Sequence, residues 1–170
     1  MRRLRDDLRE SWIAHDRDWT RPGFRAIAVH RVGNLRLASP HRSIRAAAGA
    51  VYWPLYRWVR NRYGIELPYT VKLGRGVVIE HQGAIVIHGC AEIGERSIVR
   101  HGVTIGNRHL DRPLDAPRLG ARVNVGAGAQ ILGAVTIGDD ANIGANAVVL
   151  ADVPAGATAV GVPATVRSAK

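Results

Sequence analysis

Aliphatic residues recur at a spacing of six along the last two thirds of the chain, and a small or polar residue follows most of them. The spacing slips by two residues once and is interrupted once, and over the last six repeats it is unbroken. The aliphatic positions are Leu73, Ile79 and Ile85, then, after the slip, Ile93, Val99 and Ile105, and, after the interruption, Leu119, Val125, Ile131, Ile137, Ile143 and Val149.

Neither an α-helix nor a flat β-strand has a six-residue period. A short strand followed by a turn has this period when three such units wind into one triangular coil. The aliphatic side chain of each unit then points into the coil, and successive coils pair at the usual interstrand distance of about 4.8 Å. The pattern therefore predicts a mainly β domain of stacked parallel coils over residues 64–170.

The interruption, GNRHLDRPLDAPR, covers residues 106–118 and carries several charges and two prolines. A regular coil cannot absorb such a segment, so we expect it to leave the wall as a protruding loop. Loops held on a rigid scaffold often carry functional residues.

Residues 1–63 form a basic segment that we expect to be helical. Residues 42–63 predict a helix interrupted near Pro54, and a preceding helix should have Pro22 in its first turn. The chain has a net charge of +10, and residues 1–62 contribute +9 of it, from 14 arginines and five acids. Two interpretations stay open: a cap over the open end of the coils, or a basic aromatic face that rests on anionic lipid. Nucleic acid is not expected, because no recognition motif accompanies the charge.

The chain has one cysteine, Cys90, which excludes an internal disulfide and favours a reducing compartment. The N-terminus lacks the apolar core of a secretory signal, and the uncharged run AAAGAVYWPLY is too short to cross a bilayer. We therefore expect a cytoplasmic protein, with peripheral contact at the inner membrane face as an open alternative.

Several stretches resemble the left-handed β-helix acyltransferases built from hexapeptide repeats, and among these the serine acetyltransferases most. They are LGRGVVIEHQGAIVI, HGVTIG, VNVGAGAQILGAVTIGDDANIGANAVVLADVP and AVGVPATVR. The resemblance implies a left-handed parallel β-helix with an N-terminal α-helical segment. It also implies a homotrimer with active sites between subunits, acetyl-CoA as co-substrate and no metal ion.

The acceptor is less sharply implied than the donor. Serine acetyltransferases carry a longer N-terminal helical domain, and the shorter form found here looks more like relatives that acetylate sugars or polysaccharide precursors. We therefore expect an O-acetyltransferase acting on a sugar hydroxyl, with serine O-acetylation as the alternative. A non-catalytic β-helix scaffold that binds an anionic partner through its basic helices is the alternative from a different class.

The resemblance places the catalytic base at His81. The family motif Asp-His-Ala-Thr-Gly has the base as its histidine, and Glu80-His81-Gln82-Gly83 occupies that place. An imidazole is suited to removing the acceptor's hydroxyl proton during attack on the thioester. Glu66 lies fifteen residues earlier, where the family has an orienting aspartate, so we expect a Glu66–His81 pair.

The resemblance also places the coenzyme A site. The pantetheine arm is expected against the small residues Ala127 and Ala145. Backbone N–H groups near Gly106 or Asn107, where the loop departs, are the expected donors to the oxyanion. The nucleotide phosphates need cations, which Arg167, or alternatively Arg122 or Lys170, could supply.

One departure from the family concerns the loop. The family's second histidine lies in an Arg-His-Pro-Lys-Ile pattern, and here Ala116 takes its place. His109 is a possible substitute in the same loop. His101, where the family often has glutamine, and His88 are expected to be structural or to support the site.

Overall fold

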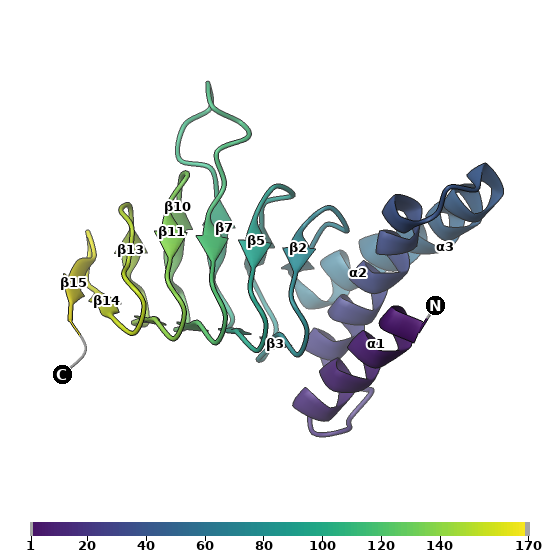
Figure 1. The fold of residues 1–170 in the computed structure, drawn as a ribbon, viewed down its shortest axis with the longest axis horizontal. Helices are drawn as coiled ribbons and strands as arrows, with labels where there is room; N and C mark the ends of the chain where they lie inside the picture. The colour runs from purple at the N-terminus through teal and green to yellow at the C-terminus, as the bar shows by residue number, and fades with distance from the viewer. Residues whose placement is uncertain (1, 169–170) are drawn as a thin grey trace.

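A computed structural model describes residues 2–168 of the chain, in which three helices precede a column of stacked coils (Figure 1). The helices are α1 (Arg2–Ala14), α2 (Pro22–Ala38) and α3 (Arg42–Tyr63). The strands are β1 (Ile65–Glu66), β2 (Lys72–Leu73), β3 (Val78–Ile79), β4 (Ile85–Ile87), β5 (Glu92–Ile93), β6 (Ile98–Val99), β7 (Thr104–Gly106), β8 (Arg118–Leu119), β9 (Asn124–Val125), β10 (Gln130–Leu132), β11 (Thr136–Ile137), β12 (Asn142–Ile143), β13 (Val148–Val149), β14 (Thr158–Val160) and β15 (Thr165–Arg167).

The strands form three sheets, which are the three faces of the column. The first face has the order β1-β4-β7-β10-β13, the second β2-β5-β8-β11, and the third β3-β6-β9-β12-β14-β15. From β1 to β13, strands that follow one another therefore lie on successive faces, as a triangular coil requires. The pairs between coils are parallel, and β15 folds back antiparallel to β14 at the last coil. The segment between β7 and β8 protrudes from the wall (Figure 1).

The aliphatic positions of the repeat fill the inside of the column. Ile87, Ile105 and Ile131 are buried and stand in register, one above the other on the first face. Adjacent coils approach closely at the corners: a Cβ atom on Gly94 would lie 2.3 Å from the backbone of Gly120. The small residue after each aliphatic one is thus required by backbone packing.

The two-residue slip lies earlier than the sequence pattern placed it. Ile79 and Ile85 are consecutive inward residues six positions apart, whereas Val99 and Val103, one coil on, are four apart. The turn of residues 80–84 therefore holds two more residues than its counterpart. The two extra residues therefore lie in the turn that carries the candidate base, His81.

Helix α3 runs through Pro54 without the expected interruption. A proline inside a helix costs about 3 kcal/mol, and packing on both sides of Pro54 opposes this cost. Tyr52 and Tyr56 are buried and stacked with ring centroids 5.3 Å apart, and the Tyr52 ring also meets Tyr69 at 5.0 Å.

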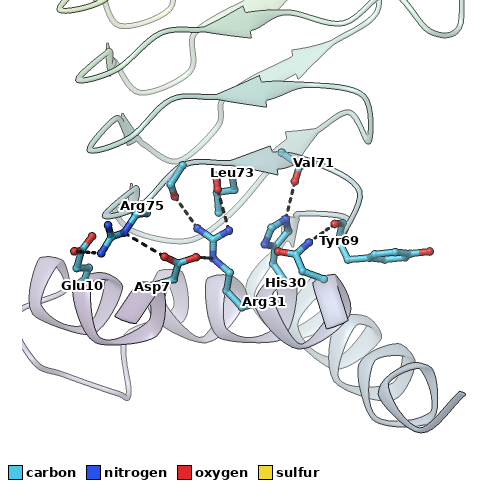
Figure 2. Close-up of polar contacts among 10 residues, drawn as sticks. Asp7, Glu10, His30, Arg31, Tyr69, Val71, Leu73 and Arg75 are labelled. Atoms are coloured by element: carbon cyan, nitrogen blue, oxygen red, sulfur yellow. Dashed lines mark hydrogen bonds and ion pairs between the residues drawn. The ribbon is translucent and has the colours of Figure 1, made fainter. Parts of the chain in front are cut away.

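Helix α2 covers the open edge of the first coil (Figure 2). Alternate residues of an unpaired strand direct N–H and C=O groups away from the column, and these groups need partners. The buried Arg31 donates to the carbonyls of Leu73, at 2.9 Å, and Gly74, at 2.7 Å. Its Nε lies 3.9 Å from a carboxylate oxygen of Asp7 in α1.

Three further side chains continue this edge. His30 Nε2 donates to the carbonyl of Val71 at 3.0 Å, and Asn34 donates to that of Tyr69 at 2.6 Å. His15, between α1 and α2, accepts the N–H of Ile79 at 3.3 Å. The helical segment is therefore a cap on the β-helix, the first of the two interpretations.

Contact with a membrane stays a prediction. No helix among residues 2–168 is long and apolar enough to span a bilayer. On α3, Ile44, Val51 and Trp58 are exposed.

The cap should weaken in acid because of His30. Burial lowers the pKa of His30 from 6.5 to about 4, and its Nδ1 has no partner among the described residues. The unfolded chain therefore takes up a proton between pH 6.5 and about 4 that the folded chain excludes. Stability from this group is complete above pH 6.5 and falls by about 3 kcal/mol as the pH drops to about 4.

Urea unfolding across this pH range measures the effect, with His30→Gln as the comparison. The variant should lose stability less steeply on acidification. A residual slope is expected from His15, because burial also lowers its pKa. Equal slopes for both proteins would contradict the assignment to His30.

Truncation inside the column should destabilise the fold strongly. Ile131→Ala removes a fully buried side chain between coils that cannot collapse around the gap, so we expect a loss of about 2–5 kcal/mol. Leu110→Ala, at a loop residue that is 96% exposed, is the control and should stay within about 0.5 kcal/mol of the parent. Urea denaturation compares the two, and similar losses would argue against the stacked core.

Candidate active site

His81 lies in the enlarged turn between β3 and β4, and its side chain is exposed. The backbone takes a left-handed conformation there, with φ of 67° at His81, 106° at Gly83 and 50° at Ala84. The turn is tied to the end of α3, because the N–H of Gly83 donates to the carbonyl of Tyr63 at 2.9 Å. The cap thus holds the turn, and the imidazole is open to a substrate.

The ring of His101, one coil further on, meets the ring of His81. Their centroids are 5.6 Å apart and their planes make an angle of 74°. Backbone hydrogen bonds continue this corner into the next two coils. The N–H of Gly128 donates to the carbonyl of His101 at 2.9 Å, and the N–H of Asn146 donates to the carbonyl of Ala127 at 2.8 Å. His81, His101, Ala127 and Ala145 therefore follow one corner of the column, which we call the histidine edge.

Neither ring of the histidine edge has a hydrogen-bond partner within residues 2–168, so the ring nitrogens are available to ligands. The adjacent carboxylate of Glu80 is engaged elsewhere, 2.8 Å from Arg100 Nε. Arg100 also donates to the side chain of Asn124 at 2.6 Å. Sequence reasoning overlooked Arg100, although it is one 20-residue coil from Glu80, as His101 is from His81.

The expected Glu66–His81 pair is not formed in this structure. Glu66 lies outward on β1, and the Tyr56 hydroxyl is 3.5 Å from its carboxylate. In the next coil it stands in register with Val86. The Glu66–His81 pair therefore stays a prediction. Burial and the Glu66 charge raise the pKa of Tyr56.

The expected coenzyme A residues divide between two corners. Ala127 and Ala145 lie on the histidine edge, partly buried and exposed respectively. Gly106 and Asn107 lie at the other end of β7, where Asn107 donates to the carbonyl of His109 at 3.0 Å. Gly106 and Asn107 therefore lie at a different corner of the column from His81.

Of the candidate phosphate-binding cations, Arg167 lies exposed on β15. Arg122 makes two hydrogen bonds to Asp140, at 2.7 and 2.6 Å, and is already paired. Lys170 lies outside the described residues.

The remaining candidate residues of the loop and the wall lie away from the histidine edge. His109 is exposed in the loop, while Ala116, at the position of the family's second histidine, is buried in the wall. His88 lies at a different corner, and its Nδ1 accepts the N–H of Cys90 at 3.2 Å. Residues 2–168 contain no group of three or more His, Cys, Asp or Glu side chains that could hold a metal ion.

Comparison with known proteins agrees with this architecture. Residues 116–151 match the family model "Bacterial transferase hexapeptide (six repeats)". A serine acetyltransferase of Helicobacter pylori strain J99 is 50% identical over 143 residues, which cover 84% of this chain and 80% of that protein.

Two solved structures are similar over nearly the whole chain. The soybean serine acetyltransferase apoenzyme has a TM-score of 0.83 and 32% identity, covering 96% of this chain and 69% of that one. The Neisseria gonorrhoeae serine acetyltransferase in complex with serine has a TM-score of 0.80 and 28% identity, covering 98% and 69%. The expected left-handed β-helix with N-terminal helices is confirmed. The chain belongs to the serine acetyltransferase family of hexapeptide-repeat acyltransferases.

Proposed function

We propose that the protein transfers the acetyl group of acetyl-CoA to the hydroxyl of L-serine. The observation that carries this proposal is the 50% identity to the Helicobacter pylori serine acetyltransferase over 80% of its length. The structurally similar Neisseria gonorrhoeae enzyme is described in complex with serine. The comparisons favour this alternative over the sugar acceptor that the short N-terminal segment suggested.

The chemistry begins at His81. A neutral imidazole takes the hydroxyl proton while the oxygen attacks the thioester carbonyl, and the transfer is direct, without an acyl-enzyme. His81 suits this role because its ring is exposed and neither ring nitrogen has a hydrogen-bond partner among the residues that the structure describes. The carbonyl oxygen becomes an oxyanion, for which the backbone near Gly106 and Asn107 is the proposed donor.

The site is proposed to lie between subunits of a homotrimer. His81 belongs to one corner of the column, and Gly106 with Asn107 to another. Two adjacent copies can bring these corners together, whereas one chain keeps them apart. The pantetheine arm would then lie along Ala127 and Ala145, with Arg167 near the phosphates.

An acceptor panel tests the proposal. Purified protein should release thiol from acetyl-CoA with L-serine, and mass spectrometry should identify O-acetyl-L-serine. The loss of the family's second histidine at Ala116 makes this test necessary. Faster turnover of a sugar than of L-serine would overturn the proposed acceptor and leave the acetyl donor intact.

We propose that the carboxylate of Glu66, on the first face, orients the imidazole of His81. If it acts on His81 during turnover, Glu66→Gln should lower kcat by about tenfold or more, within the range of a supporting partner. Tyr56→Phe, which removes the observed partner of Glu66, should leave kcat nearly unchanged. Steady-state kinetics compare the two variants. Equal, small effects would assign Glu66 to the packing of α3.

A further inference from the structure

We propose that Arg100 binds the carboxylate of the acceptor amino acid and thereby selects it over other hydroxyl compounds. This inference rests on the proposed function, because it takes L-serine as the acceptor and His81 as the base. It starts from the guanidinium of Arg100, which three acceptors of the wall hold in place and which belongs to the residue before His101.

The guanidinium of Arg100 is fixed by the coils on either side of it. Its Nε lies 2.8 Å from a carboxylate oxygen of Glu80. Its Nη1 donates to the side chain of Asn124 at 2.6 Å and to the carbonyl of Val125 at 3.3 Å. Its Nη2 has no hydrogen-bond partner among residues 2–168, and the side chain is 29% exposed. The N–H groups of Nη2 are therefore open to a ligand on a guanidinium that is already oriented.

This guanidinium lies close to the candidate base. Glu80 precedes His81 in one coil. Arg100 precedes His101 at the same position of the next coil, where β6 pairs with β3. The charged pair and the two rings thus come from adjacent positions, and consecutive residues of an extended chain are about 3.3 Å apart. In L-serine only the α and β carbons separate the hydroxyl oxygen from the carboxylate, so both groups must bind within this short distance.

A carboxylate on the acceptor needs a partner of this kind. A carboxylate that leaves water has to be paired with hydrogen-bond donors, and a charged donor of fixed direction serves best. Glu80 positions the guanidinium through Nε, and Nη2 stays available for the acceptor. Arg100 can therefore recognise a carboxylate without first giving up its contacts to Asn124 and Val125.

The other charged groups around the site are less suited to this role. Arg25 is engaged within the cap, where its Nη1 donates to the Tyr63 hydroxyl at 2.6 Å and its guanidinium packs against two indole rings. In the protruding loop, Asp115 stands where the family pattern Arg-His-Pro-Lys-Ile begins with arginine. An aspartate repels a carboxylate, so the loop position does not supply the cation and Arg100 does.

Acceptors with and without a carboxylate test the assignment. Steady-state kinetics compare L-serine with ethanolamine, which keeps the hydroxyl and amino groups and lacks the carboxylate. We expect the parent to prefer L-serine, and Arg100→Gln to lose about 10–100-fold of kcat/KM for L-serine, the contribution of a charge-assisted hydrogen bond. For ethanolamine the variant should stay within about twofold of the parent, because no contact to this acceptor is removed.

Lys72→Gln is the matched control for Arg100→Gln. It removes the cation of another ion pair between adjacent coils, in which Lys72 Nζ lies 2.8 Å from Glu92, on the second face of the column. Its kcat/KM should equal that of the parent for both acceptors. A loss like that of Arg100→Gln in this control would mean that any broken ion pair of the wall lowers activity.

A purely structural role of Arg100 predicts a different pattern. A loosened wall lowers kcat/KM equally for both acceptors, and such an equal loss overturns the inference. L-serine turnover in Arg100→Gln within about twofold of the parent also overturns it, as does a parent that does not distinguish the two acceptors. If the glutamine variant does not fold, Arg100→Lys takes its place. It keeps a cation without the planar fork and should lose part of the preference for L-serine, and an unchanged preference contradicts the assignment.

These outcomes are distinct from a failure of the proposed function. A parent that turns over a sugar faster than L-serine loses its proposed acceptor, whatever the effect of Arg100→Gln. A parent that prefers L-serine and keeps this preference in Arg100→Gln retains the proposed function and loses only the role of Arg100.

Discussion

Replacing His81 by asparagine should lower kcat by about 10²–10⁴-fold, the usual contribution of a positioned general base. Asparagine is the better replacement here, because it tolerates the left-handed backbone of this residue, at φ 67°, more readily than alanine. The fold should persist, since the side chain is exposed and has no hydrogen-bond partner among the described residues. Steady-state kinetics with acetyl-CoA and L-serine measure the change.

His88→Asn provides the control for this experiment. It removes a histidine from the same wall at a different corner, and its kcat should stay near that of the parent. Coenzyme A binding by His81→Asn, measured by calorimetry, should be close to the parent value. A variant that binds coenzyme A and retains full turnover would show that another group takes the proton.

Replacing Arg31 by methionine should cost about 3 kcal/mol of unfolding free energy, because the carbonyls of Leu73 and Gly74 lose their donor. Burial lowers the pKa of Arg31, so its charge is itself costly to bury, and the apolar replacement recovers part of the loss. Urea denaturation gives the change. Arg45→Met, at an exposed arginine of α3, is the matched control and should be nearly neutral.

The Arg31→Met substitution should also lower activity at the candidate active site. The turn that carries His81 is bonded to the last residue of α3, through Gly83 and Tyr63. A loosened cap therefore leaves the turn less well held, and Arg31→Met should lower kcat as well as stability. Unchanged stability in Arg31→Met would mean that the first coil does not need its helical cap.

The coils were predictable because one inward residue per unit repeats along the sequence. The location of the slip was not, because the strands are so short that Ile85 and Ile87 both point inward and either fits the period. The continuity of α3 at Pro54 depends on tyrosines that pack on both sides of it. The rule that proline interrupts a helix considers only neighbouring residues, so it cannot take such tertiary contacts into account.

The candidate site was predictable in part. The resemblance to the family motif identified His81 as the candidate base, and the exposure of its side chain follows from its place in a corner. The Glu66–His81 pair was expected from a spacing close to one coil and from the family's aspartate at that place, and it stays a prediction. The ring contact with His101 arises from the same insertion, so it could be recognised only once the register of the coils was known.

A crystal structure with coenzyme A and L-serine bound together would measure the central geometry directly. We expect the serine hydroxyl within about 2.6–3.2 Å of a ring nitrogen of His81, in a cleft that a second copy of the chain completes. A serine hydroxyl held by other side chains, with the His81 ring turned to solvent, would contradict it.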